Sequence, residues 1–170
     1  MAEAGTQFAA QFNREWLAHS IRTTIAAIVS LYVARLVGLP EAYWATITTL
    51  VVMQSTLGAA LAPSWQRFVG TMLGAAAGAL AATYFRANTT VFTLGIFVLG
   101  LLCALLRLDR SAYRFAGTTL AIVVLTSNHE NAAWVAALHR FVEVSIGIGV
   151  GLLIMAAWPE REATATAKSS

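Results

Sequence analysis

Arginine is the residue type that could do chemistry inside the apolar stretches of this sequence. Arg22 and Arg114 lie about one turn into such stretches, whereas Arg67 and Arg140 stand at the start of two others. A guanidinium can hold a carboxylate through two hydrogen bonds, and at a helix start it adds to the positive end of the helix dipole. It can equally extend to water and leave only its stem among apolar groups. For Arg22, Arg67 and Arg114, anion binding and surface anchoring therefore both remain open.

Arg140 is followed one helical turn later by the acid Glu143. Residues three apart lie on the same face of a helix, so these two side chains can form an ion pair. The sequence predicts either a structural ion pair or a gate at this position.

Two apolar stretches carry hydroxyl and amide side chains at corresponding places. A single Thr means little, because its hydroxyl can bond to a carbonyl of its own helix. Their recurrence predicts that both stretches line a pathway. Four aromatic side chains could stack on an aromatic substrate there, although an aromatic belt already explains the first three: Tyr43, Trp44, Tyr113 and Phe115. The polar residues are Thr46, Thr48, Thr49, Gln54 and Ser55 in the first stretch, and Thr118, Thr119, Thr126 and Ser127 in the second. The candidate substrate-binding residues are Arg22, Trp44, Thr48, Gln54, Arg67, Arg114 and Thr118, and the candidate gate or ion pair is Arg140 with Glu143.

The sequence lacks the residue patterns that metal binding and catalysis need. His19, His129 and His139 show no helical spacing with a carboxylate, and Cys103 is the single cysteine, so no metal site is predicted. The sequence contains no phosphate-binding glycine loop, no nucleophile motif and no pair of catalytic acids. An enzyme, a cofactor and a nucleic-acid partner are therefore not expected.

The composition indicates an integral membrane protein. Hydrophobic residues make up 58% of the 170 residues, charged residues only 11%, and the mean hydropathy is +0.69. Soluble domains carry about 25% charged residues. The mixed polar start of the chain is unlike a cleavable signal peptide, so the first apolar segment is expected to stay in the mature protein.

The hydrophobic segments predict an all-α fold with six transmembrane helices. Each segment approaches the ~20 residues needed to cross a hydrocarbon layer of ~30 Å. A short leader at 1–16 and a polar tail at 159–170 are both expected in the cytoplasm, with the longer connections at 59–65 and 129–138. The predicted helices are about 17–37, 42–58, 66–86, 89–107, 111–128 and 139–158.

Tryptophan and basic residues support this topology. All five Trp residues fall at a predicted helix end or in a connection, as in the aromatic belts of membrane proteins. Most basic residues fall on the side of the N-terminus, which by the positive-inside rule places both termini in the cytoplasm. The Trp residues are Trp16, Trp44, Trp65, Trp134 and Trp158.

The second half of the sequence repeats the first weakly. Setting Tyr43 on Tyr113 brings two Thr-Thr-Leu triplets together, and Arg67 then falls on Arg140 after three extra residues. Because each copy, about 17–86 and 89–158, holds three helices, the second must cross the membrane in the opposite sense. The prediction is an inverted repeat of three plus three helices. Glycines four residues apart in the third and sixth helices indicate close packing at the protomer centre or a subunit interface.

The sequence resembles a known family over about residues 15–158, which is nearly the whole chain. The segments YWATITTLVVMQSTLGAAL and WQRFVGTMLGAAAG, with the element Arg67-Phe68-Val69-Gly70-Thr71, are similar to the fusaric-acid-resistance-like, or aromatic acid exporter, membrane domain. The same superfamily includes the plant aluminium-activated malate channels. The resemblance implies six helices, a dimeric assembly and movement of organic anions such as aromatic carboxylates. Family members often carry a large cytoplasmic domain after the sixth helix, where this sequence has a short polar tail.

The combined expectation is a multi-pass protein of the bacterial inner membrane that exports organic anions as a homodimer. The alternative is a membrane scaffold or a subunit of a larger permease that transports nothing itself. Flux of an anionic aromatic acid into liposomes containing the purified protein distinguishes the two.

Overall fold

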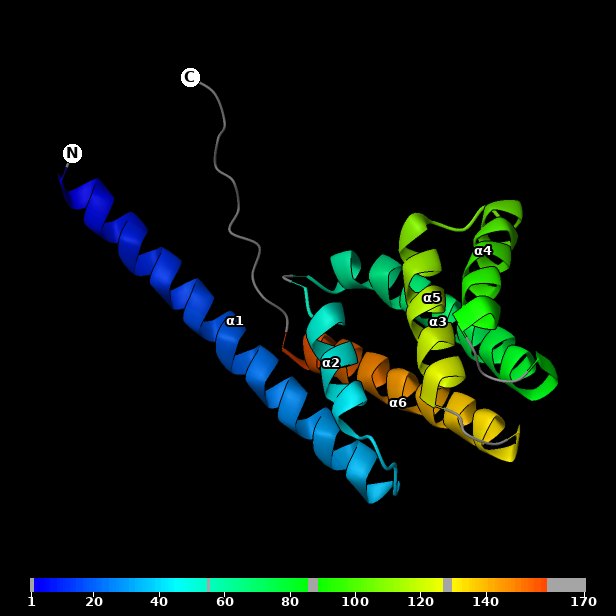
Figure 1. Cartoon of the computed structure of the whole chain (residues 1–170). Helices are drawn as coiled ribbons and strands as arrows, with labels where there is room; N and C mark the ends of the chain where they lie inside the picture. Colours follow the sequence, from blue (N-terminus) through cyan, green and yellow to red (C-terminus); the bar gives the residue numbers. More distant parts are fainter. Residues whose placement is uncertain (1, 55, 86–88, 127–129, 159–170) are drawn as a thin grey trace.

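The computed structural model describes residues 2–54, 56–85, 89–126 and 130–158. In these residues the chain is all-helical, as predicted, and the connections between helices are short (Figure 1). The helices are α1 (Ala2–Leu36), α2 (Tyr43–Val52), α3 (Leu57–Phe85), α4 (Thr89–Leu105), α5 (Arg110–Thr126) and α6 (Glu130–Ala157).

The helices pack in an order that differs from their order in the sequence. Helices α3 and α6 lie against each other at the centre, with α5 on α3 and α2 on α6. Helix α1 covers α2 and α6, and α4 covers α5 and α3. The spatial order is therefore α1, α2, α6, α3, α5, α4, which can be followed across Figure 1.

Two helices end in the same local structure. After α1 the Gly38 N–H donates to the Arg35 carbonyl and the Leu39 N–H to the Ala34 carbonyl, with Gly38 at a φ of 81°. This is a Schellman end, in which a left-handed residue satisfies the last carbonyls of a helix. Helix α4 ends in the same pattern around Arg107, whose φ is 53°.

The connection between α2 and α3 lies earlier than predicted. Helix α2 ends at Val52 and not near residue 58, and α3 begins at Leu57 and not at 66. The hydroxyl of Thr56 accepts a hydrogen bond from the Ala59 N–H and so caps the start of α3. Pro63, which favoured a connection in the sequence, lies inside α3, as membrane helices allow.

The start of α6 was also predicted wrongly. This helix begins at Glu130 rather than at 139, so residues 130–138 are part of it and not a separate surface segment. As a consequence, Arg67 and Arg140 each lie about three turns inside their helix, not at its start. The helix dipole therefore adds nothing to the charge of either arginine, because its effect fades within the first turn.

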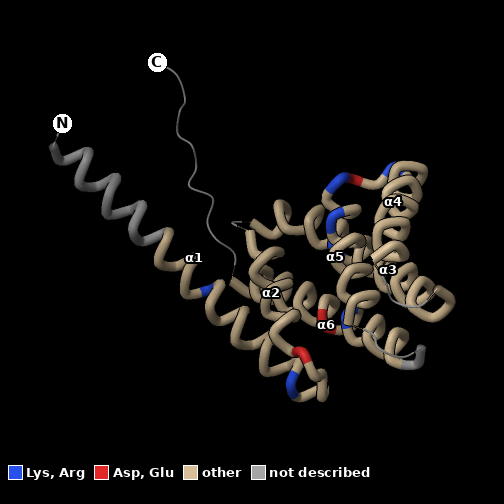
Figure 2. The backbone as a smooth tube through the Cα atoms, in the orientation of Figure 1, with Lys and Arg blue, Asp and Glu red and all other residues tan. Residues whose placement is uncertain are grey.

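The surface is apolar along most of the molecule. Within the described residues, three segments are long and apolar enough to span a membrane: Trp16–Leu36, Leu57–Phe85 and Ala132–Ala157. Helices α2 and α4 are apolar but shorter, and for these two and α5 the predicted crossing stays a prediction. Among the described residues charged positions are few along the backbone, and several stand at connections between helices (Figure 2). Large apolar side chains face outwards, such as Leu36, which is 86% exposed.

The glycines of α3 and α6 allow close contacts within the chain. A Cβ atom on Gly74 would fall on the backbone carbonyl of Ala116 in α5, and one on Gly147 would fall on that of Ala45 in α2. Such contacts need a residue without a side chain. The predicted packing role is confirmed, and these two glycines contact helices of the same chain.

Candidate functional site

Arg67 lies buried between three helices. It projects from α3, is 8% exposed, and donates a hydrogen bond from Nε to the Thr48 hydroxyl of α2 at 3.1 Å. Its guanidinium lies over the Phe115 ring of α5, 4.8 Å from the ring centre. Among the residues that the structure describes, no carboxylate pairs with Arg67.

Arg140 of α6 has a different set of neighbours. Its guanidinium lies over the Trp44 ring at 4.2 Å and donates to Glu143 Oε2 at 3.2 Å. It also forms an ion pair with Glu41, which stands in the connection between α1 and α2. The predicted pair of Arg140 with Glu143 is present, and a second acid joins it.

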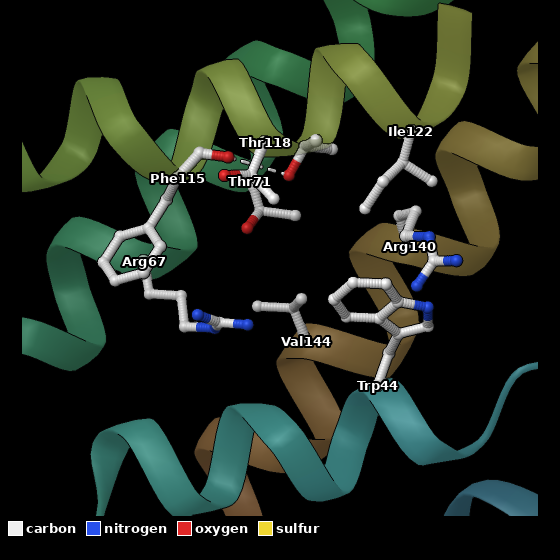
Figure 3. Close-up of a pocket in the computed structure, with 9 residues that line it drawn as sticks. Trp44, Arg67, Thr71, Phe115, Thr118, Ile122, Arg140 and Val144 are labelled. Atoms are coloured by element: carbon white, nitrogen blue, oxygen red, sulfur yellow. Dashed lines mark hydrogen bonds between the residues drawn. The ribbon is translucent and has the colours of Figure 1, made fainter. Parts of the chain in front are cut away.

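Both arginines line one small cavity, the Arg67 cavity. Figure 3 shows Arg67 and Arg140 at opposite sides of it, with Val144 between them. Its volume is about 30 Å³, which is room for one or two water molecules. Its lining residues are Trp44, Arg67, Thr71, Phe115, Thr118, Thr119, Ile122, Arg140 and Val144.

A larger cavity, the Glu143 cavity, lies on the other side of Arg140. Its volume is about 240 Å³, and it shares Arg140 and Ile122 with the Arg67 cavity. These two side chains therefore separate the two spaces. Its lining residues are Pro40, Glu41, Ile122, Thr126, Ala132, Val135, Ala136, His139, Arg140 and Glu143.

Glu143 is fully buried, with an exposed fraction of 0%. Its Oε2 accepts the hydrogen bond from Arg140, whereas its Oε1 has no partner within the described residues. A buried carboxylate oxygen without a partner is costly, so this side of the site has capacity for a further donor.

The structure brings together some of the predicted site residues. Trp44, Arg67, Thr118 and Arg140 line the Arg67 cavity, and Glu143 lies in the adjoining one. Thr48 takes part by holding Arg67.

Three other predicted residues lie elsewhere. Arg22 is buried and donates to the backbone carbonyls of Gln54 and Trp158, so it joins α1 to the ends of α2 and α6. Gln54 takes part through its backbone. Arg114 is exposed and donates to the Ser111 hydroxyl. Arg22, Arg67 and Arg114 therefore do not form one basic surface.

Sequence reasoning missed two neighbours of the arginines. Glu41 follows Pro40 in a connection and was passed over, although it stands three residues before Trp44. Phe115 was noted as a possible stacking partner for a substrate, but not as the ring beneath Arg67. Phe115 stands one helical turn before Thr118 and Thr119, and this spacing could have placed its ring beside the predicted pathway.

Contacts of the first half are matched by contacts of the second. Arg67 lies over Phe115, as Arg140 lies over Trp44. Gly74 packs on Ala116, as Gly147 packs on Ala45, and Gly78 packs on Val123, as Gly151 packs on Val52. When these contacts are matched, Trp44 of α2 corresponds to Phe115 of α5. In the sequence comparison Trp44 corresponds to Arg114, so the contacts shift that alignment by one residue. That arrangement leaves Thr48 opposite Thr119.

The fold and the site define the class of protein. Long apolar helices, outward-facing apolar side chains and polar groups gathered in the interior are the features of a multi-pass membrane protein. No group of three or more His, Cys, Asp and Glu side chains in the described part of the chain could hold a metal ion.

The chain belongs to the Fusaric acid resistance protein family, whose pattern matches residues 16–170. It is 28% identical to Inner membrane protein YeeA of Escherichia coli over 85% of this chain and 42% of the relative. It is 32% identical to Uncharacterized transporter YdhK of the same species, over 83% of this chain and 22% of the relative. The chain thus spans less than half the length of these relatives.

Proposed function

We propose that this chain forms part of a transporter that moves organic anions across the bacterial inner membrane, with Arg67 contacting the anion. The observation that carries the proposal is the buried guanidinium of Arg67, which faces a hydroxyl-lined cavity and has no carboxylate partner among the described residues. The names of the relatives, an inner membrane protein and a transporter, agree with this role.

A buried, unpaired arginine is costly. Guanidinium groups stay protonated in proteins, and a charged Arg at the centre of a membrane helix costs about 2.5–3.5 kcal/mol on insertion scales. A bound carboxylate would offset that cost, because it accepts two hydrogen bonds from the guanidinium. Phe115 beneath Arg67 adds a ring face beside the same site, which favours anions with an aromatic group.

We further propose that the two halves are inverted repeats and that all six helices span the membrane, with both termini in the cytoplasm. The proposal is supported by the spatial order of the helices, which is symmetric about the contact of α3 with α6. It is also supported by the matched contacts of Arg67 with Phe115 and of Arg140 with Trp44. In such transporters the substrate site lies near the bilayer midplane at the interface of the repeats.

The cavities agree with a closed conformation of this pathway. The Arg67 cavity of about 30 Å³ is too small for an organic anion, whereas the Glu143 cavity holds about 240 Å³. Transport then requires Arg140 and Ile122 to move apart and join the two spaces. A homodimer, as the family resemblance implies, is part of the proposal.

The test is anion flux into liposomes that contain the purified protein. Arg67→Gln keeps the side-chain length and removes the charge, so benzoate flux should fall at least about tenfold, as expected for loss of a charge-assisted hydrogen bond. Arg110→Gln is the matched control, because Arg110 is exposed at the start of α5. Equal flux in the two variants would remove Arg67 from the pathway. Absence of benzoate flux in the unsubstituted protein would favour a scaffold role.

A further inference from the structure

Glu41 occupies a site built for a carboxylate. Its Oε2 accepts a hydrogen bond from the Trp44 indole N–H at 3.2 Å and pairs with the Arg140 guanidinium. The guanidinium itself is held in place over the Trp44 ring and by Glu143. A cation and an indole donor thus converge on one carboxylate oxygen, while Glu143 supports the cation. This carboxylate belongs to the chain.

We propose that Arg140 and Trp44 form a second anion-binding site, and that Glu41 is a tethered occupant which the carboxylate of an organic anion displaces. The inference rests on the proposed function, since it concerns the same class of substrate. It adds a second binding position and a built-in competitor that controls access to it.

The internal match between the two halves supports a binding role for Arg140. Arg67 on Phe115 corresponds to Arg140 on Trp44, so the same guanidinium and ring pair occurs twice. In this match the counterparts of Glu41 and Glu143 are Ala112 and Gly70, which pack on each other. Acids therefore accompany Arg140, whereas its counterpart Arg67 has no acid partner among the described residues.

The space beside Arg140 suits a small aromatic acid. The Glu143 cavity of about 240 Å³ exceeds the roughly 150 Å³ that holds benzene in an engineered protein cavity. Its wall combines apolar side chains such as Val135 and Ala136 with the polar groups of Thr126 and His139. A single-ring carboxylate can therefore place its ring in this cavity and its charge on Arg140.

Glu41 can leave the site at low cost. Its side chain is 43% exposed and stands in the short connection after α1, so its carboxylate can turn to water. Glu143 is fully buried on the same helix as Arg140 and keeps that guanidinium paired during the exchange. The second site therefore opens without leaving a buried cation alone.

The test is equilibrium binding of benzoate to the full chain purified in detergent. Glu41→Gln removes the competing charge, so this variant should bind two benzoates per chain at a benzoate concentration at which the unsubstituted protein binds one. Affinity at the added site should rise about tenfold or more, as expected for removal of a charged hydrogen-bonding competitor. Benzamide, which lacks the charge, should not bind. Asp109→Asn, at an exposed acid in the connection before α5, should leave binding unchanged.

The added site must depend on Arg140. The double variant Glu41→Gln with Arg140→Gln should return to one benzoate per chain. Unchanged or weaker binding in Glu41→Gln, while Arg67→Gln still abolishes binding, would overturn the second site alone. Absence of benzoate binding in every variant would overturn the proposed function as well. If Glu41→Gln does not purify folded, Glu41→Asp must give a smaller gain of the same sign, because its carboxylate is withdrawn by one methylene; no gain overturns the proposal.

Discussion

At the scale of residues, Arg67 and Arg140 lie in equivalent places but differ in the acidic side chains beside them. Both lie over an aromatic ring of a neighbouring helix, but Arg140 has two carboxylates and Arg67 has a hydroxyl. Arginine keeps its charge in either place, so the neighbours decide what each guanidinium does. Arg140 pairs with two acids of its own chain, whereas Arg67 has no carboxylate partner among the described residues.

Thr48 is expected to hold Arg67 in position. Thr48→Val keeps the shape and removes the acceptor for Arg67 Nε, so the free energy of unfolding should fall by about 1.5–3 kcal/mol, as for hydrogen bonds to charged groups. Thr118→Val is the matched control, because the Thr118 hydroxyl is exposed and donates to the Arg114 carbonyl of its own helix. Chemical unfolding in detergent measures both. Equal losses in the two variants would contradict a special role for the contact of Thr48 with Arg67.

The sequence predicted part of this site. Arg140 with Glu143 followed from their spacing, and Arg67 from its charge in an apolar stretch. The ion pair with Glu41 joins residues 99 positions apart. No local periodicity encodes such a contact, because it depends on α2 packing against α6, which lies far from it in the sequence.

At the scale of elements, α3 and α6 hold the bundle together through helix faces that carry glycine. Each approaches the backbone of a helix from the other half of the chain, α3 on α5 and α6 on α2. Glycine spacing predicted that these helices would pack closely. It did not predict where they begin, because Pro63 favoured a connection and the capping Thr56 was read as part of α2.

Neighbouring glycines of α6 provide a test of this packing. Gly147→Ala places a methyl group against the Ala45 carbonyl and the Thr48 side chain, and should lower the free energy of unfolding by about 1–3 kcal/mol. Gly149→Ala adds a methyl group where nothing lies within 4 Å, and should be neutral or raise stability by up to about 1 kcal/mol. Thermal unfolding in detergent compares the pair. If Gly147→Ala lowers the free energy of unfolding less than Gly149→Ala does, then α6 does not pack on α2 in this register.

At the scale of the whole molecule, the row of helices joins the halves of the chain instead of separating them. The central contact is α3 with α6, and each half gives its second helix to the third helix of the other. The two arginine sites lie on these crossed contacts, since Arg67 meets Phe115 of α5 and Arg140 meets Trp44 of α2. A relative movement of the halves would therefore change both sites together, which is the coupling that alternating access requires.

The inverted repeat can be tested at two equivalent positions. Ala59 and Ala132 are each the third residue of their helix, α3 and α6, and both are exposed. Because equivalent points of inverted repeats face opposite sides of the membrane, Ala59→Cys should react with a membrane-impermeant thiol reagent from the cytoplasm and Ala132→Cys from outside. Cys103 is 2% exposed, and its replacement by Ala removes the remaining background. Labelling of both new cysteines from one side would show that the halves run in parallel, and the paired arginine sites could then not exchange access between the two faces.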